Sequence, residues 1–318
     1  MMIDLNEAAE LLKNNDNILI LVHGNPDGDT LGSGFALKSA LACLGKKVAV
    51  RCSDKIPPKY AFLGELDGAF DAEFIVAVDV ADPKLLGKEL ETAYGDKIRL
   101  CIDHHGSNLR YAENTALDSD AAATCEMIIE IIRLLGVEIS KHMADCLYTG
   151  LSTDTGCFRY SNVTPRTMRM AADMIEAGAE NAKINTAMFE TKTKTYAKLE
   201  KLALDSLKMY LDGRCAVITV TQEMYAQSGS NETEVDAIAA LPRQIEGVLV
   251  GVTMREKEDG SFKVSMRSHD NVDVSAICAM MGGGGHRCAG GCKVEGPQNK
   301  AAETVVANVE KYLTENQK

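Results

Sequence analysis

Residues 17–29 read NILILVHGNPDGD and join an unbroken apolar run to a polar segment that is rich in turn-forming and acidic residues. Apolar residues without polar alternation, as from Ile18 to Val22, are typical of a strand that is buried on both faces of a sheet. The polar segment is followed by Leu31 to Leu44, where apolar residues recur at helical spacing. A buried strand, a turn and a helix in this order are the repeating unit of a doubly wound parallel α/β sheet.

The same alternation continues to about Leu151, and a helical, charged segment then runs from Thr164 to Lys208. The remainder predicts a smaller α/β domain with a hairpin around Glu258–Ser261 and a loop of four glycines. We expect a first domain over 1–187, a helical linker over 188–212 and a second domain over 213–318. In the first domain we predict further strands over 46–51, 73–80 and 98–103 and helices over 121–135 and 141–151; in the second, strands over 214–221, 247–255, 262–266 and 292–294 and helices over 274–281 and 299–313.

The composition, 318 residues with 46% apolar and 25% charged, is typical of a soluble globular protein of two domains. The net charge of −12 leaves no general positive field to bind a long nucleic-acid duplex. An acidic N-terminal segment and the lack of a long apolar run predict a cytoplasmic protein without a membrane partner. The ten cysteines form no CxxC pair, which favours reduced thiols, and a zinc site at His286, Cys288 and Cys292 would lack a fourth ligand.

Acidic and histidine side chains stand where three of the predicted strands end. In an open parallel sheet the carboxyl ends of the strands line one crevice, so we expect these side chains to lie close together. Asp154, at the end of an apolar helical stretch, offers a further carboxylate to the same crevice. The residues are His23, Asp27 and Asp29 after the first strand, Asp79 at the strand over 73–80, and Asp103, His104 and His105 at the strand over 98–103.

Each of these residues also has a structural interpretation: His23 caps a strand, Asp27 and Asp29 form turns, and Asp79 caps the helix that follows. That interpretation would have to hold separately for each of these residues, and each of them is a charged group whose burial without a partner costs free energy. Bound cations remove the cost for all of them together. Carboxylate and imidazole ligands without thiolate favour Mn, Fe or Zn over Ca, and a pair of metals is the usual apparatus for hydrolysing phosphate esters.

The pattern His23-x3-Asp27-x-Asp29, Asp79, Asp103-His104-His105 and Asp154 resembles the four motifs of the DHH phosphoesterase superfamily in order and spacing. The run Gly282–Gly285 with His286, preceded by SMRS at 265–268, resembles the DHHA1 domain. Together the two resemblances cover nearly the whole chain, and its length is most similar to stand-alone nanoRNase/pAp phosphatases. The resemblance implies a doubly wound parallel-sheet DHH domain joined by a helical linker to a smaller α/β DHHA1 domain.

The resemblance also implies a role for each residue of the pattern. It assigns one metal to His23 and Asp27, a second to Asp29, His104 and Asp154, and both to Asp79. The predicted catalytic residues are Asp79, Asp103, which orients its neighbours, and His105, which faces the substrate phosphate or protonates the leaving oxygen. Such proteins usually prefer two Mn²⁺, with Mg²⁺, Co²⁺ or Fe²⁺ as substitutes.

In the second domain, the resemblance implies that Arg267 and His286 hold a non-scissile phosphate of the substrate. The glycine run lets the backbone approach a ligand closely and point its amides at the same phosphate, and a flexible turn is the alternative interpretation. Arg243 either adds to this basic pocket or is a solvated surface residue. The glycines that we expect to bind substrate are Gly283, Gly284 and Gly285.

The expected activity is that of an Mn²⁺-dependent phosphoesterase, which degrades short oligoribonucleotides to mononucleotides and 3′-phosphoadenosine 5′-phosphate (pAp) to AMP and phosphate. Its partners are then short RNA or DNA oligonucleotides, pAp or pApA, and a homodimer is a further hypothesis because homodimers are the commonest soluble oligomers. Hydrolysis of cyclic di-AMP or pApA stays open as an alternative. A silent nucleotide-binding sensor would be expected to lack a ligand, and a pyrophosphatase to lack the glycine–histidine motif. An exonuclease on long single strands would be expected to have further binding domains and a basic, aromatic channel, which 5% aromatic residues and no Trp disfavour.

Overall fold

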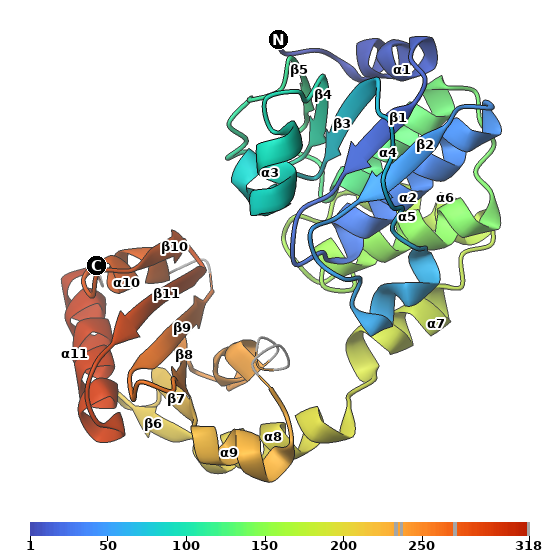
Figure 1. Cartoon of the computed structure of the whole chain (residues 1–318). Coiled ribbons are helices and arrows are strands. Elements are labelled where there is room, and N and C mark those ends of the chain that lie inside the picture. Colours follow the sequence, from blue (N-terminus) through green and yellow to red (C-terminus); the bar gives the residue numbers. More distant parts are fainter. Residues whose placement is uncertain (232–234, 236–237, 270–271, 317–318) are drawn as a thin grey trace. The chain divides into compact units, whose positions relative to one another are not determined.

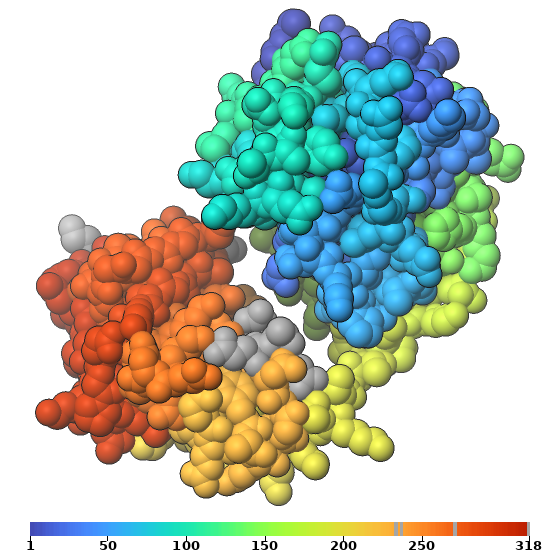
Figure 2. Space-filling model, viewed as in Figure 1, coloured from blue at the N-terminus to red at the C-terminus, as the bar shows by residue number. Residues whose placement is uncertain are grey.

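The computed structural model describes residues 1–231, 235, 238–269 and 272–316. Contacts divide the chain into two compact units, Met1–Thr191 and Lys192–Lys318, so the division falls within the stretch over 188–212 that the sequence predicts as a linker. In the space-filling view the first unit is coloured from blue to yellow-green and the second from yellow to red, and the atoms within each unit are closely packed (Figure 2). No helix within the described residues is long and apolar enough to cross a membrane.

The first unit is built on a five-stranded sheet in the order β2-β1-β3-β4-β5, with every adjacent pair parallel (Figure 1). This confirms the predicted doubly wound parallel sheet. Because β1 pairs with β2 on one side and β3 on the other, the strand order reverses there, and ligands bind at such a switch point. The strands are β1 (Ile18–Leu21), β2 (Val48–Arg51), β3 (Phe74–Val78), β4 (Leu100–Asp103) and β5 (Asn114–Leu117).

Successive residues of β1 belong to two different cores, one on each face of the sheet. Ile18 and Ile20 belong to the core that also contains residues of the helices α1, α2, α4, α5 and α6, whereas Leu19 and Leu21 belong to a core with residues in and around α3. A strand that is buried on both faces has to be apolar at every position, which explains the unbroken run that opens the sequence pattern. The helices are α1 (Leu5–Asn14), α2 (Gly28–Cys43), α3 (Lys88–Tyr94), α4 (Thr124–Leu134), α5 (Lys141–Asp154) and α6 (Pro165–Glu176), with shorter turns at η1 (Pro58–Leu63), η2 (Pro83–Leu86), α7 (Asn181–Asn185) and η3 (Thr186–Glu190).

In the second unit, the described residues form a six-stranded sheet in the order β10-β11-β9-β8-β7-β6, in which β7 and β8 are parallel and the other adjacent pairs are antiparallel. The predicted hairpin is the antiparallel pair β8–β9. The strands are β6 (Lys208–Tyr210), β7 (Cys215–Val220), β8 (Val250–Glu256), β9 (Phe262–Ser268), β10 (Gly284–His286) and β11 (Ala289–Val294).

Helices cover both faces of this second sheet, and the two faces of β7 belong to different cores. Residues of α10 (Val274–Ala279) and α11 (Gln298–Asn316) share a core with apolar side chains of β8, β9 and β11. On the opposite face, α8 (Lys194–Asp205) and α9 (Gln222–Ser228) pack on Ile218 and Val220 of β7. A short turn, η5 (Pro242–Gln244), precedes β8.

The glycine run corrects one expectation from the sequence. Instead of forming a loop throughout, residues 284–286 form the edge strand β10, which pairs with β11 in the register Gly285↔Gly290. Gly285 has φ +145°, and a Cβ there would lie 2.5 Å from the carbonyl oxygen of Ala289. The backbone conformation and the close approach of β11 therefore require a glycine at this position, independently of any ligand.

Candidate metal centre

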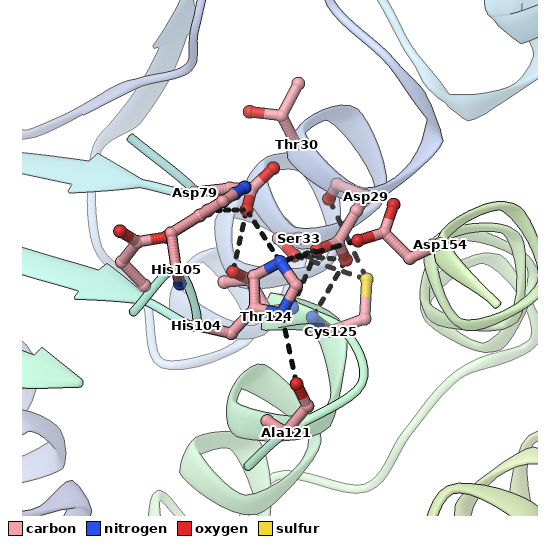
Figure 3. A network of polar contacts seen from close by, with 12 residues as sticks. Asp29, Thr30, Ser33, Asp79, His104, His105, Ala121, Thr124, Cys125 and Asp154 are labelled. Carbon is pink, nitrogen blue, oxygen red and sulfur yellow. Dashed lines mark hydrogen bonds and ion pairs between the residues drawn. The ribbon is translucent and has the colours of Figure 1, made fainter. Parts of the chain in front are cut away.

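Close packing of two helices brings two of the predicted ligands together. A Cβ on Gly32 of α2 would lie 2.3 Å from the carbonyl oxygen of Cys146 in α5, and one on Gly150 of α5 would lie 2.7 Å from Oδ1 of Asp29. Because neither helix carries a side chain at these points, their backbones approach directly. Asp29 in the first turn of α2 and Asp154 at the last turn of α5 consequently face the same space (Figure 3).

The carboxyl ends of β1, β3 and β4 deliver the remaining ligands to that space. His23 follows β1, Asp79 follows β3, and β4 ends at Asp103, directly before His104. Asp79 has φ +61°, a conformation that costs energy in a residue other than glycine, and its N–H donates to the carbonyl of Ile102 at 2.9 Å. Strained backbone of this kind, held by its surroundings, is common at functional sites.

His23 stands between two carboxylates. Its Nε2 atom lies 3.8 Å from Oδ1 of Asp27 and 3.6 Å from Oδ2 of Asp79. The other ring nitrogen, Nδ1, donates to the carbonyl oxygen of Gly24 at 2.8 Å, so when the ring is neutral its lone pair is on Nε2. One backbone hydrogen bond thus fixes the tautomer that a metal ligand needs.

His104 is surrounded in the same way by three acids from three other segments. Its Nε2 atom lies 3.4 Å from Oδ2 of Asp154, 3.8 Å from Oδ1 of Asp79 and 3.9 Å from Oδ2 of Asp29. Nδ1 donates to the carbonyl of Ala121 at 3.1 Å, and the buried Nε2 has no hydrogen-bond partner among the described residues. Two atoms bound to one cation at about 2.1 Å are roughly 3–3.5 Å apart, so the arrangement fits a cation.

Among the described residues, three overlapping groups of side chains could hold metal ions, and in each group the ligand atoms lie within 4.8 Å of one another. Asp79 belongs to two of the groups and His104 to two. None of these groups, within the part of the chain that the structure describes, includes His286, Cys288 or Cys292. The groups are His23 with Asp27 and Asp79; Asp29 with His104 and Asp154; and Asp79 with His104 and His105.

The crowded carboxylates give the centre a strongly negative electrostatic potential. Burial raises the pKa of Asp29 to about 7, with the charge of Asp79 adding to the effect. Burial and then the charge of Asp29 raise the pKa of Asp154 well above its usual value. Burial opposes protonation of His23, but Asp27 and Asp79 outweigh it and raise its pKa to about 11. Divalent cations would neutralise this cluster, and carboxylate with imidazole is a donor set that Mn²⁺, Fe²⁺ or Zn²⁺ accepts.

Asp103 and His105 form a separate pair beside the ligands. The buried Asp103 accepts hydrogen bonds from Nδ1 of His105 at 2.8 Å and from Nδ2 of Asn108 at 2.6 Å, one on each oxygen. The bond to Asp103 raises the pKa of His105 to about 9. Asn108 was not found by sequence reasoning, because an asparagine in a polar loop gives no signal of its partner.

The predicted substrate-binding residues of the second unit lie on one face of its sheet. His286 is opposite Ala289, which is opposite Arg267, and directly opposed residues point to the same face. Arg267 and His286 are therefore two strands, or about 10 Å, apart on that face. Arg267 also donates from Nη1 to the carbonyl of Met266 at 3.0 Å.

Arg243 reaches the same face through a close backbone contact. Gly251 lies opposite Arg267 in the β8–β9 register, and a Cβ on Gly251 would lie 2.4 Å from the backbone nitrogen of Arg243. The side chain of Arg243 donates from Nη1 to the carbonyl of Ser268 at 3.3 Å. Of the three glycines, Gly284 faces open space, whereas Gly283 packs against the carbonyl of Gly291.

Comparisons with known proteins agree with this architecture. The sequence matches the DHH family, N-terminal domain, over residues 17–151 and the DHHA1 domain over 212–315. It is 35% identical over 318 aligned residues to a bifunctional oligoribonuclease and PAP phosphatase, NrnA, of Thermus thermophilus, covering 96% of this chain and 94% of the relative. A probable bifunctional oligoribonuclease and PAP phosphatase NrnA of Streptococcus mutans is 26% identical over 88% of this chain and 90% of that protein. The crystal structure of an exopolyphosphatase-related protein from Bacteroides fragilis has the same fold, with TM-score 0.88 and 23% identity over 99% of this chain and 97% of that one.

The parallel sheet with acids and histidines at its strand ends, followed by a second α/β unit, defines a class of metal-dependent hydrolases of phosphate esters. The chain belongs to the DHH family of phosphoesterases and carries a DHHA1 domain. Within that family it is most similar, among the proteins named here, to the oligoribonuclease and PAP phosphatase of Thermus thermophilus.

Proposed function

We propose that the chain hydrolyses short oligoribonucleotides to mononucleotides and pAp to AMP and phosphate, with two Mn²⁺ ions as cofactor. The observation that carries this proposal is the buried Nε2 atom of His104, with carboxylate oxygens of Asp29, Asp79 and Asp154 at 3.4–3.9 Å. The choice of substrates is supported by the similarity to the relative from Thermus thermophilus, which is named for both activities.

We assign His23 and Asp27 to one cation, Asp29, His104 and Asp154 to the second, and Asp79 to both. The shared role of Asp79 is supported by its two oxygens, since Oδ2 lies 3.6 Å from Nε2 of His23 and Oδ1 lies 3.8 Å from Nε2 of His104. When bound, two such cations supply positive charge to the phosphoryl oxygens and acidify the attacking water.

His105 is the proposed proton donor or phosphate contact. Its Nδ1 is bound by Asp103, so the proton available to a substrate is the one on Nε2. In the metal-free site the bond to Asp103 raises the pKa of His105 to about 9, and a protonated imidazole can hold a phosphoryl oxygen or protonate the leaving oxygen. Asp103 would hold the ring in the orientation that this requires.

In the second unit we assign the recognition of a further phosphate to Arg267 and His286. Their position on one face of the sheet supports this role. Gly284 adds a backbone that has no neighbour within 4 Å of its absent Cβ among the described residues, so a ligand can approach it closely. Gly283 and Gly285 would then act by shaping this segment, since both pack tightly on β11.

The test is a comparison of kcat/KM for pAp, pApA, a five-nucleotide RNA, cyclic di-AMP and pyrophosphate, each with Mn²⁺. We expect pAp and the short RNA to be the best substrates. A preference for cyclic di-AMP would replace the proposed substrate class while keeping the metal centre. Failure to cleave any of the five by protein that binds Mn²⁺ would contradict the proposal as a whole.

A further inference from the structure

The N-terminus of α4 has no cap of its own. Ala123 occupies the N-cap position, and an alanine has no side-chain oxygen to accept hydrogen bonds from the first N–H groups of the helix. Instead, the N–H of Thr124 donates to Oδ2 of Asp29 at 2.6 Å and that of Cys125 donates to Oδ1 at 2.9 Å. A carboxylate from α2 therefore caps α4, and the helix end holds both of its oxygens (Figure 3).

Thr124 also contacts the second central carboxylate of the site. Its hydroxyl Oγ1 donates to Oδ1 of Asp79 at 2.9 Å. Thr124 and Asp29 are 0% exposed and Asp79 is 2% exposed, so bulk water has no access to replace these bonds. One residue thus joins a carboxylate of α2 to a carboxylate at the end of β3.

The segment from Ala121 to Cys125 orients ligands on three other elements. The carbonyl of Ala121 accepts from Nδ1 of His104, and Thr124 and Cys125 hold Asp29 and Asp79 as described. Among the described residues, this segment belongs to none of the groups that could bind metal. Its side chains and backbone contact the ligands without replacing them.

We propose that Thr124 is a positioning residue, which fixes the orientation of Asp29 and Asp79 relative to each other and thereby sets the affinity of the centre for its cations. The hydroxyl occupies one lone pair of Asp79 Oδ1 and stops the carboxylate from rotating about its Cβ–Cγ bond. Partners of this kind typically change metal affinity 10- to 100-fold when they are removed. This inference rests on the metal centre of the proposed function but is independent of the substrate.

The experiment measures Mn²⁺ binding to the EDTA-treated full chain by isothermal titration calorimetry. Thr124→Val keeps the shape and the backbone N–H but removes the hydroxyl, and we expect it to bind Mn²⁺ about 10- to 100-fold more weakly. Thr124→Ser restores the hydroxyl and should bind nearly as tightly as the unmodified chain. The matched control is Thr115→Val in β5, where a buried threonine hydroxyl has no partner among the described residues.

A purely structural role for Thr124 predicts a different result, namely a lower melting temperature of the metal-free protein with unchanged Mn²⁺ affinity. Equal affinity of Thr124→Val and the unmodified chain would overturn the inference. If Thr124→Val does not fold by circular dichroism, Thr124→Ala and Thr124→Ser, which differ by the hydroxyl alone, make the same comparison. If the unmodified chain itself binds no Mn²⁺, the metal centre of the proposed function fails, a result that is distinct from equal binding.

Discussion

Asp79 is the residue on which the three histidines of the centre converge. Its carboxylate faces His23, His104 and His105, and it accepts the hydroxyl hydrogen bond of Thr124. The residue has φ +61°, and its two oxygens face different histidines, Oδ2 facing His23 and Oδ1 facing His104. The conformation of this one residue therefore matters to both proposed cation sites.

We predict that Asp79→Asn lowers kcat/KM for pAp by at least about 100-fold. Removing a ligand that both cations share should reduce activity more than removing a residue that only contacts a ligand. Asparagine tolerates a positive φ, so the backbone is preserved. Steady-state kinetics with Mn²⁺ measure the loss, thermal melts in EDTA check that the variant folds, and retained activity would contradict the shared role.

A second prediction at the scale of the residue concerns Arg267. Arg267→Ala should raise KM for pAp about tenfold or more with little change in kcat, because a bond between charged groups is lost in binding rather than in chemistry. The KM for 3′-AMP, which has no 5′-phosphate, should hardly change. Lys263→Ala is the control, since Lys263 is on the same strand and lies four residues from Arg267. Equal loss of turnover on both substrates would contradict a phosphate-binding role.

At the scale of the element, the contact between α2 and α5 decides where two acids stand. A Cβ on Gly150 would lie 2.2 Å from Sγ of Cys125 as well as 2.7 Å from Oδ1 of Asp29. The packing of two helices and the capping of a third, α4, meet at this glycine. The position of Asp29 is consequently a property of three helices together.

Gly150→Ala should therefore destabilise the first unit by about 1–3 kcal/mol, the usual cost of overpacking, although alanine is the better helix former. It should also weaken Mn²⁺ binding, because Asp29 has to move. Urea denaturation and calorimetry measure the two effects. Gly68→Ala, where no described atom lies within 4 Å of the added Cβ, should change neither. Unchanged stability of Gly150→Ala would show that the helices can separate without cost.

At the scale of the molecule, the two units have separate hydrophobic cores, and the residues of the metal centre all belong to the first. A ligand that binds only the folded form of one unit stabilises that unit by mass action. Metal binding and the stability of the DHHA1 unit should therefore be independent.

We predict that Mn²⁺ at 100 times its Kd raises the melting temperature of the first unit by about 5–10 °C and leaves that of the second unit unchanged. Differential scanning calorimetry, with hydrogen exchange to assign each transition, measures the shift. The Asp79→Asn protein serves as the control and should show a much smaller shift. Equal shifts of both transitions would contradict independent units.

The sequence predicted the parts of the fold that a local pattern determines. Apolar runs of β1, β3 and β4 are unbroken because each strand is buried on both faces, and the parallel arrangement of strands gathers whatever follows them at one edge. This is why the ligand types and their convergence could be predicted. In contrast, β5 has four residues with a polar start and gave no signal, and the glycine run was wrongly predicted as a loop.

Only the tertiary structure decided how the ligands are held. Thr124 meets Asp29 across 95 residues of sequence and Asp79 across 45, so no local spacing relates them. The role of Gly150 likewise depends on the crossing of two helices. The sequence by itself determined which side chains reach the edge of the sheet, because backbone periodicity is local; the packing of distant segments determined their orientation, because hydrogen bonds and close contacts form wherever the fold brings atoms together.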